Sequence, residues 1–124
     1  MRKESDIRVV VGLDFGTTYS GFAYCHLSNP QEIIINSEWQ NMSVQVKTNT
    51  VLQYDYEYNN VISWGLPALA KKPNRRSKNK DNSFNRPIEL FKLHLSDLSD
   101  QCKLKLLIEY KKAITDYLRE IGKV

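Results

Sequence analysis

Cysteine is scarce in this chain of 124 residues, which contains only Cys25 and Cys102. The two thiols lie far apart and form no pair at metal-ligand spacing, so nothing in the sequence indicates a cysteine-based metal site. Two distant cysteines are typical of reduced thiols in a cytosolic protein. A disulfide between them stays open at this point, although no other feature indicates one. We therefore expect a cytoplasmic protein.

Long apolar runs are also lacking, because no stretch approaches the ~18 residues that a membrane helix needs. The amino terminus, MRKESDIR, carries charges of both signs, and the apolar stretch after it is short and interrupted by Asp14. This pattern predicts neither a signal peptide nor contact with a membrane. His26 and His94 have no partner at metal-ligand spacing, so we expect ordinary surface or core histidines.

Aromatic residues are missing from the most basic segment, KKPNRRSKNK, which spans residues 71–80. Bases stack on aromatic side chains, so their absence here makes nucleic acid an unlikely partner class. The positive charge of this run exceeds the formal net charge of +4 of the whole chain, so the rest of the chain is near charge balance. It predicts a solvated basic loop over residues 71–85, and a nuclear-import signal is its other interpretation.

An apolar run interrupted by a polar turn stands near the start, in the segment VVVGLDFGTTYSGFAYCHL of residues 9–27. With the apolar content at 41%, the chain is long enough for one domain with a core. Val9, Val10, Val11 and Leu13 suit a strand that is buried on both faces. Residues 14–18 interrupt the run and an extended pattern resumes at Tyr19, so the segment predicts a β-hairpin.

The residues of this turn have the chemistry of a phosphate site. Gly16 has no Cβ, so the backbone can bend and a ligand can approach it closely. Successive amides of such a turn can converge on an anion, and the hydroxyls of Thr17 and Thr18 add donors. Asp14 is placed to hold a hydrated Mg²⁺ that bridges to phosphate oxygens. An ordinary hairpin with a Gly-Thr turn is the alternative.

Residues 14–16 also spell the Asp-Phe-Gly tripeptide that binds metal in protein kinases. In that fold the tripeptide follows a glycine-rich loop, a strand lysine and a His-Arg-Asp catalytic loop. None of these can precede residue 14, and His-Arg-Asp occurs nowhere in the chain. We therefore do not expect a protein kinase.

The segment GLDFGTTYSGFAY resembles the first phosphate-binding motif of the actin-like ATPases, and most closely that of the seventy-kilodalton heat-shock (DnaK-like) chaperones. Sugar kinases share only a looser Asp-x-Gly-Thr/Ser version. The resemblance implies binding of ATP or ADP with magnesium. Asp14 would anchor Mg²⁺ through water, and Gly16, Thr17, Thr18 and Tyr19 would wrap the β- and γ-phosphates.

The remaining chain alternates strand and helix patterns. Glu32–Asn36 predicts a third strand of an antiparallel meander, after a turn at Ser28–Pro30. Thr50–Tyr58 and Val61–Trp64 predict a hairpin with Leu52, Tyr54, Tyr56 and Tyr58 on one face. Further helices are predicted for three segments, namely residues 66–72, residues 86–95 and an amphipathic helix over residues 103–121 with Gly122 as its cap and Asp116 on the wet side.

Lys92 is a second candidate site residue, on the resemblance alone. In the chaperone family a lysine of the capping subdomain acts on the terminal phosphate. Lys92 follows a Trp-Gly-x-x-Ala passage and precedes a long helix, as that lysine does. The alternative is a surface lysine on an amphipathic helix.

Together these patterns predict an α/β (mixed α+β) fold, which the resemblance identifies as an incomplete actin-like ATPase (ribonuclease H-like) lobe. Its segments are a charged tail over 1–6, the phosphate-binding meander over 7–36, a capping-subdomain-like region over 37–95, and a loop and helix over 96–124. All belong to one nucleotide-binding domain.

The resemblance covers residues 7–124, which correspond to only the first part of the family's ATPase domain. The second phosphate motif would come from later sequence, so we expect weak ATP binding and little hydrolysis. The uncovered sheet edge and helix face predict poor solubility or a partner protein. The alternative function is therefore an interaction module that binds another protein through that helix face.

Overall fold

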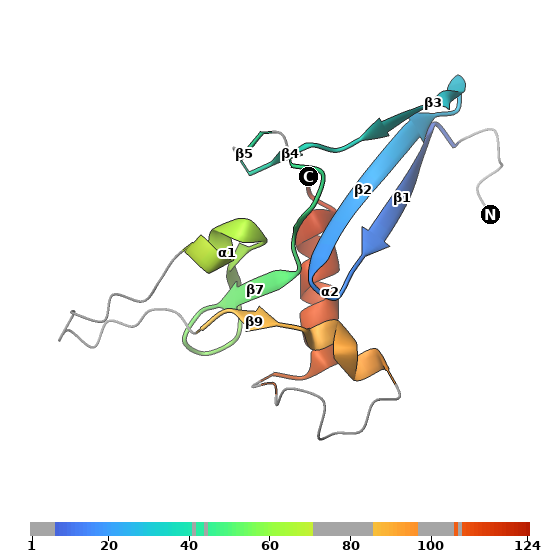
Figure 1. Cartoon of the computed structure of the whole chain (residues 1–124). Coiled ribbons are helices and arrows are strands. Elements are labelled where there is room, and N and C mark those ends of the chain that lie inside the picture. The colour runs from blue at the N-terminus through green and yellow to red at the C-terminus, as the bar shows by residue number, and fades with distance from the viewer. Residues whose placement is uncertain (1–6, 41, 44, 71–85, 97–105, 107) are drawn as a thin grey trace.

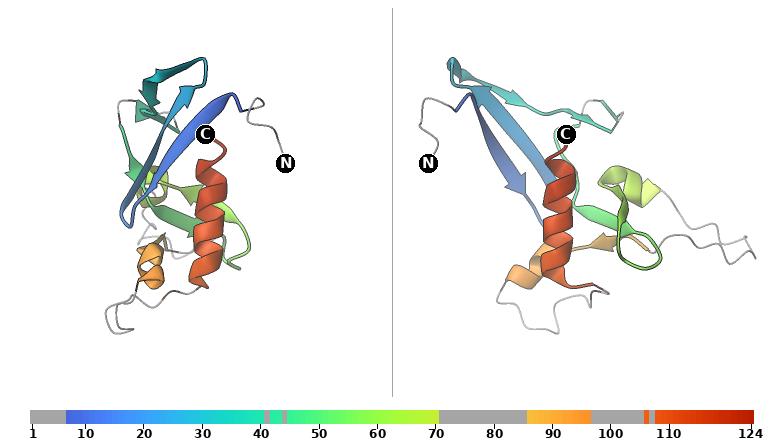
Figure 2. Two further views of the ribbon diagram at one scale, coloured as in Figure 1. Left: turned by 90° about the vertical axis from the view of Figure 1, so that its right-hand side faces the viewer. Right: turned by 180° about the vertical axis from the view of Figure 1, so that it is seen from behind.

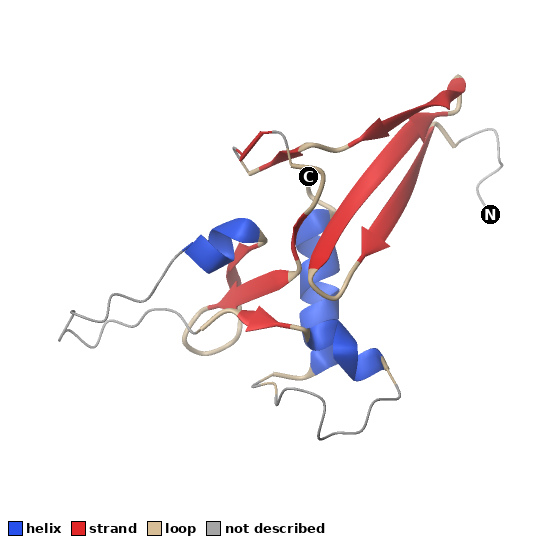
Figure 3. Ribbon diagram, viewed as in Figure 1, coloured by secondary structure: helices blue, strands red, loops and turns tan. Residues whose placement is uncertain are grey.

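A computed structural model describes residues 7–40, 42–43, 45–70, 86–96, 106 and 108–124 of the chain. The described part is a mixed α+β structure with antiparallel sheets and a C-terminal helix (Figure 3). Its elements are, in chain order, β1 (Val9–Phe15), β2 (Tyr19–His26), β3 (Asn29–Ile35), β4 (Glu38–Trp39), β5 (Met42–Ser43), β6 (Thr48–Asn49), β7 (Val51–Tyr54), β8 (Val61–Trp64), α1 (Leu66–Ala70), β9 (Ile88–Glu89), the 3₁₀ helix η2 (Phe91–Leu95) and α2 (Tyr110–Ile121).

The first three strands form the predicted antiparallel meander. β1 and β2 pair without a break from Val9 opposite His26 to Phe15 opposite Ser20, so the hairpin prediction is confirmed. β2 also pairs with β3, and with β6 beside the hairpin turn. The predicted turn at Ser28–Pro30 is wrong in part, since β3 already begins at Asn29. Proline fits there because β3 is an edge strand among the described residues.

The prediction that β1 is buried on both faces is wrong. The meander projects away from the rest of the molecule (Figures 1 and 2). Helix α2 packs instead against η2 and against the second sheet, which consists of β7, β8 and β9. Apolar side chains are therefore exposed along β1 and β3, namely Val9, Val10, Val11, Leu13, Ile33, Ile34 and Ile35.

The second sheet has the strand order β8-β7-β9. β7 and β8 form the predicted hairpin, but the predicted row of tyrosines is interrupted at Tyr56, while Tyr58 packs against the core with its ring 6.2 Å from that of Tyr54. Tyr54 is fully buried, whereas the Tyr56 side chain is exposed. The reason is local, because Asp55 accepts hydrogen bonds from the backbone N–H groups of Tyr58 and Asn59 and so closes a turn directly after the strand.

The predicted helix over residues 86–95 is wrong. The segment consists of β9, which pairs with β7, followed by the short helix η2. Leu90 separates the two with a φ of 57°, a left-handed conformation that no α-helix contains. Lys92 lies on η2 and not on an amphipathic α-helix.

The last helix is shorter than predicted, because α2 begins at Tyr110. Of the predicted earlier part, Leu106 and residues 108–109 are not helical, and residues 103–105 and 107 lie outside the described residues. Gly122 ends the helix as predicted, but with right-handed backbone angles. Asp116 is buried, so its predicted place on the solvent-facing side is wrong.

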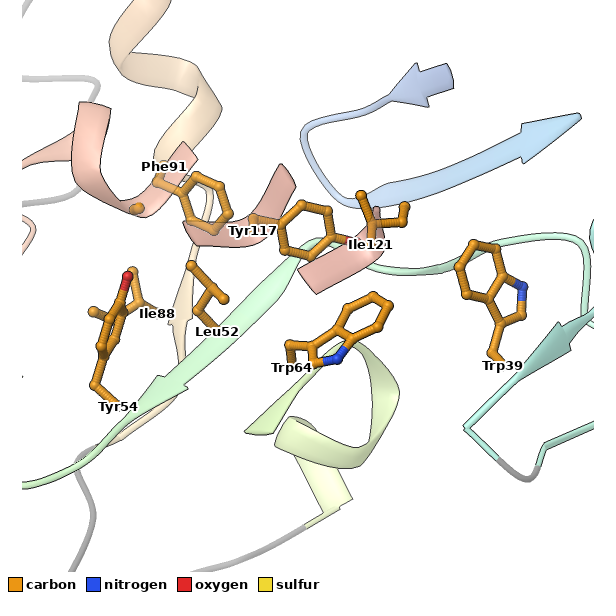
Figure 4. Packing of buried hydrophobic residues seen from close by; sticks show 9 residues of the cluster. Trp39, Leu52, Tyr54, Trp64, Ile88, Phe91, Tyr117 and Ile121 are labelled. Carbon is orange, nitrogen blue, oxygen red and sulfur yellow. The ribbon is translucent and has the colours of Figure 1, made fainter. Parts of the chain in front are cut away.

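The core lies between α2, η2 and the second sheet (Figure 4). Tyr117 of α2 occupies its centre, with its ring 5.9 Å from that of Phe91 and 5.8 Å from that of Trp64. The buried members are Trp39, Leu52, Tyr54, Trp64, Ile88, Phe91, Ala113, Tyr117 and Ile121.

The predicted bare helix face is small, because Ala113, Tyr117 and Ile121 of α2 are buried and Leu118 is 37% exposed. None of the described helices has the length and apolar character required to cross a membrane. The basic loop predicted over residues 71–85 lies outside the described residues, as do the charged tail over 1–6 and Cys102.

Candidate functional site: the turn between β1 and β2

The candidate site is the turn of residues 16–18 between the first two strands. Gly16 is required there by its surroundings, because a Cβ at this position would lie 2.1 Å from the carbonyl oxygen of Tyr19. That distance is far inside van der Waals contact, so no other residue fits without moving the backbone. The sequence-based argument for Gly16 as the residue that lets the chain bend therefore agrees with the geometry.

Two carbonyl groups of the turn are held by Thr50. The Thr50 hydroxyl donates to the carbonyl oxygen of Gly16 over 2.8 Å, and the Thr50 amide donates to that of Thr18 over 2.8 Å. The same hydroxyl lies 2.7 Å from the Ser20 hydroxyl in a buried hydrogen bond. Thr50 thus fixes the turn from outside the hairpin.

Two amide groups of the turn are left available. Within the described residues, the N–H groups of Thr17 and Thr18 donate no hydrogen bond, whereas the N–H group of Gly16 faces the Tyr19 carbonyl oxygen across the hairpin. Thr18 and Tyr19 are exposed, and Thr17 is half-buried. A turn with bound carbonyls and available amides presents a positive concentration of N–H dipoles, which suits an anion.

Asp14 lies at the end of β1 beside this turn, and its Oδ2 atom is 2.6 Å from the Lys47 ammonium. The hydrogen bond and the positive charge of Lys47 hold the pKa of the Asp14 carboxyl below its ordinary value, and the charge of Lys92 adds to this. Both side chains of the pair are largely exposed. Asp14 is therefore an ionised and reachable carboxylate.

Lys92 is brought to the same place by η2. Its ammonium donates a hydrogen bond to the carbonyl oxygen of Phe15, the residue before Gly16, and lies 5.2 Å from the centre of the Phe15 ring. Two lysines from distant segments thus flank the turn on which the sequence analysis placed a phosphate.

The Phe15 ring connects the turn to the core. It stacks on Tyr117 with the ring centres 5.8 Å apart, and it lies 6.4 Å from the ring of Phe91. Tyr117 also donates a hydrogen bond from its hydroxyl to the carbonyl oxygen of Asn49, which precedes Thr50. The two segments that shape the turn therefore rest on one core side chain.

The donor set around Asp14 suits a metal that binds few protein ligands. No group of three or more His, Cys, Asp or Glu side chains that could hold a metal occurs in the part of the chain that the structure describes. Mg²⁺ commonly keeps several waters and binds through one or two carboxylates together with phosphate oxygens. One exposed carboxylate beside available amides fits that pattern.

The structure thus brings together all the predicted site residues, Asp14, Gly16, Thr17, Thr18, Tyr19 and Lys92. Sequence reasoning missed Lys47 and Thr50. Both lie far along the chain from the turn, and neither stands in a local motif. The register of β6 against β2, which sets Thr48 opposite Ser20, is what brings them to the turn.

Comparisons of the chain with protein-family models, with curated proteins and with solved structures find no match.

Proposed function

We propose that the turn between β1 and β2 binds the phosphates of a magnesium nucleotide, as the first phosphate site of a chaperone-type, actin-like ATPase. In this proposal Gly16, Thr17, Thr18 and Tyr19 contact the β- and γ-phosphates. Asp14 holds Mg²⁺ through water, and Lys92 faces the terminal phosphate. The ligand is ATP or ADP.

One observation carries the proposal: Thr50 binds two carbonyl groups of the turn, the amides of Thr17 and Thr18 stay available, and two lysines contact the adjoining residues of β1. Backbone amides and ammonium groups both attract phosphate oxygens. An ordinary hairpin turn needs neither the external hydrogen bonds from Thr50 nor a lysine at each side. The motif GLDFGTTYSGFAY and its resemblance to the chaperone family give the proposal its nucleotide specificity.

Asp14 and Lys47 form an ion pair that a metal ion would replace. The Lys47 ammonium occupies the position of a cation on Oδ2 of Asp14. This ion pair is exposed to solvent and therefore weak, so a metal ion can displace the ammonium.

The proposal includes binding without efficient hydrolysis. Phosphoryl transfer depends on positioning and on charge stabilisation from groups around the nucleotide. Around this turn the described residues supply one carboxylate and two lysines. We therefore assign the site weak affinity for ATP and little turnover by this chain.

Calorimetric titration of the purified chain with Mg-ATP tests the proposal. We expect saturable heat from the wild type in the millimolar range or below, and loss of that heat in Asp14→Asn. The matched control is Glu38→Gln, which removes an exposed carboxylate on β4. That variant is expected to bind as the wild type does.

Absence of heat from the folded wild type up to millimolar Mg-ATP would contradict the proposal. Equal loss of binding in Asp14→Asn and Glu38→Gln would also contradict it, because the effect would then follow net charge alone. A phosphate-binding turn without nucleotide specificity would appear as equal binding of Mg-ATP and magnesium pyrophosphate.

A further inference from the structure

β1 presents an open hydrogen-bonding edge. The Leu27 amide donates to the carbonyl oxygen of Arg8 over 3.0 Å, so the backbone groups of Arg8 face β2. Because these groups alternate along an antiparallel strand, the N–H and C=O groups of Val9, Val11 and Leu13 face the other way. Within the described residues no strand pairs with that side of β1.

This edge lacks the features with which proteins usually protect an edge strand. Charged side chains, proline and bulges commonly prevent a second strand from adding. β3 has Pro30 and Glu32 within its bounds, whereas Val9–Leu13 contains no charged residue and no proline. Val11, at the middle of Val9–Leu13, is 58% exposed.

The open edge has a defined length. The carbonyl group of Phe15 lies on the same side of β1 as those of Val11 and Leu13, and Lys92 donates to it. Lys92 thus ends the edge at Asp14. With Arg8 at the other end, the available segment runs over residues 8–14 and has Val11 at its centre.

We propose that β1 pairs antiparallel with β1 of a second copy of this chain, about a two-fold axis at Val11. In this register Arg8 of each copy stands opposite Asp14 of the other, so both ends of the pair join opposite charges. Val9 stands opposite Leu13, and Val11 stands opposite itself. Opposite charges and apolar side chains that face each other across strands stabilise a sheet.

The directions of the backbone N–H and C=O groups along β1 are compatible with the register centred on Val11. Pairs of odd-numbered residues have their N–H and C=O groups toward the second copy, so Val11 with Val11 and Val9 with Leu13 form about six hydrogen bonds in total. If the register of the two β1 strands shifts by two residues, Asp14 of one copy stands either opposite Val10 of the other copy or past its Arg8. Only the register centred on Val11 joins Arg8 to Asp14 at both ends.

Asp14 can pair with Arg8 of the second copy while it stays paired with Lys47. The ion pair uses Oδ2, and the side chain of Asp14 remains largely exposed. The dimer requires no nucleotide and no metal, so it is independent of the proposed function. Measurements in EDTA without nucleotide therefore test it separately.

Analytical ultracentrifugation of the full chain provides the first test. We expect a wild-type dimer whose dissociation constant rises at least about tenfold in Arg8→Asp, because like charges then face each other at both ends. The exchanged double variant, Arg8→Asp with Asp14→Arg, is expected to recover dimerisation. A monomeric wild type at several hundred micromolar, or no recovery in the folded double variant, would overturn the proposal.

Disulfide trapping tests the register itself. In a Cys25→Ser, Cys102→Ser background, Val11→Cys places two thiols at the axis, where opposed Cα atoms about 5.5 Å apart permit a disulfide. The matched control is Val46→Cys, since Val46 is 56% exposed but lies outside β1. Rapid cross-linking of Val11→Cys alone supports the register. Equal cross-linking of both variants would show that another surface associates, and would overturn it.

Discussion

The Lys47 ammonium lies 2.6 Å from the Asp14 carboxylate although 33 positions separate the two residues in the sequence. β6 brings Lys47 there, because its pairing with β2 places Thr48 opposite Ser20. The contact keeps Asp14 ionised, and it puts a cation where the proposed site would hold Mg²⁺. Asp14 thus has one role in the hairpin as folded and another in the proposed complex.

The variant Lys47→Met separates these roles. Removing the ammonium takes away the main cause of the lowered pKa of Asp14, so we expect that pKa to rise toward its ordinary value. The carboxylate is also freed for Mg²⁺, so the affinity for Mg²⁺ should rise or stay equal, not fall. A pH titration of the Asp14 carboxyl carbon by NMR measures the first effect. An unchanged or lower pKa would contradict the pairing in solution.

Gly12 and Gly16 belong to the same motif, so Gly12→Ala is a matched control for Gly16→Ala in the turn. A Cβ at Gly16 would overlap the Tyr19 carbonyl oxygen, whereas a Cβ at Gly12 has its nearest neighbour, the Ala23 carbonyl oxygen, at 4.0 Å. We expect Gly16→Ala to shift the amide signals of the turn and to abolish binding of Mg-ATP. Gly12→Ala should retain the wild-type amide signals of the turn and the binding of Mg-ATP. NMR spectra with and without ligand measure this, and an unaffected Gly16→Ala would contradict the turn geometry.

Local patterns predicted the parts of the fold that depend on neighbours in sequence. The β-hairpin followed from an apolar run interrupted over residues 14–18, and the two strands pair without a break up to the turn. The site residues within the turn were accessible to the same reasoning. Lys47 and Thr50 were not, because only the pairing of β6 with β2 relates them to the turn.

Long-range contacts also explain the wrong predictions. The apolar spacing of residues 86–95 suits a helix, but Ile88 pairs with Leu52 of β7 and Leu90 turns the chain. The Val9–Leu13 run suits a buried strand, yet no described helix packs over it. The helical spacing predicts Asp116 on the solvent-facing side of the helix, yet the Tyr54 hydroxyl of β7 donates a hydrogen bond to it.

Asp116 is a buried carboxylate with three partners. The Tyr54 hydroxyl donates to it over 2.6 Å, the Lys112 ammonium lies 2.8 Å away and the Arg119 guanidinium 2.9 Å away. Burial alone would raise the pKa of Asp116, but the hydrogen bonds from Lys112 and Tyr54 and the two positive charges outweigh it and lower the pKa. The ionised form therefore belongs to the folded state.

Stability should fall in acid because of Asp116. A carboxyl whose pKa is lower in the folded than in the unfolded chain stabilises the fold above its ordinary pKa of about 4, and this contribution is lost as the pH falls through the folded pKa. In Asp116→Asn we expect the free energy of unfolding to drop by about 1–3 kcal/mol at pH 7. Its decline between pH 5 and pH 2 should be shallower than that of the wild type. Urea unfolding at each pH measures both, and an equal decline would assign the acid sensitivity to other carboxyls.

Tyr117 links the core to the turn, and its two functions can be tested separately. Tyr117→Phe removes only the hydroxyl, which donates to the Asn49 carbonyl and interacts with the Ser20 and Thr50 hydroxyls, so we expect a loss of about 1 kcal/mol in the free energy of unfolding. Tyr117→Ala also removes the ring that Phe15, Phe91 and Trp64 contact, and should cost about 3–5 kcal/mol. Because the Phe15 ring then loses its stacking partner, the amide signals of residues 16–18 should shift more in Tyr117→Ala than in Tyr117→Phe. Urea unfolding followed by tryptophan fluorescence gives the energies, and NMR spectra give the shifts. If both variants lost the same stability, the ring contacts of Tyr117 would contribute nothing to the stability of the fold.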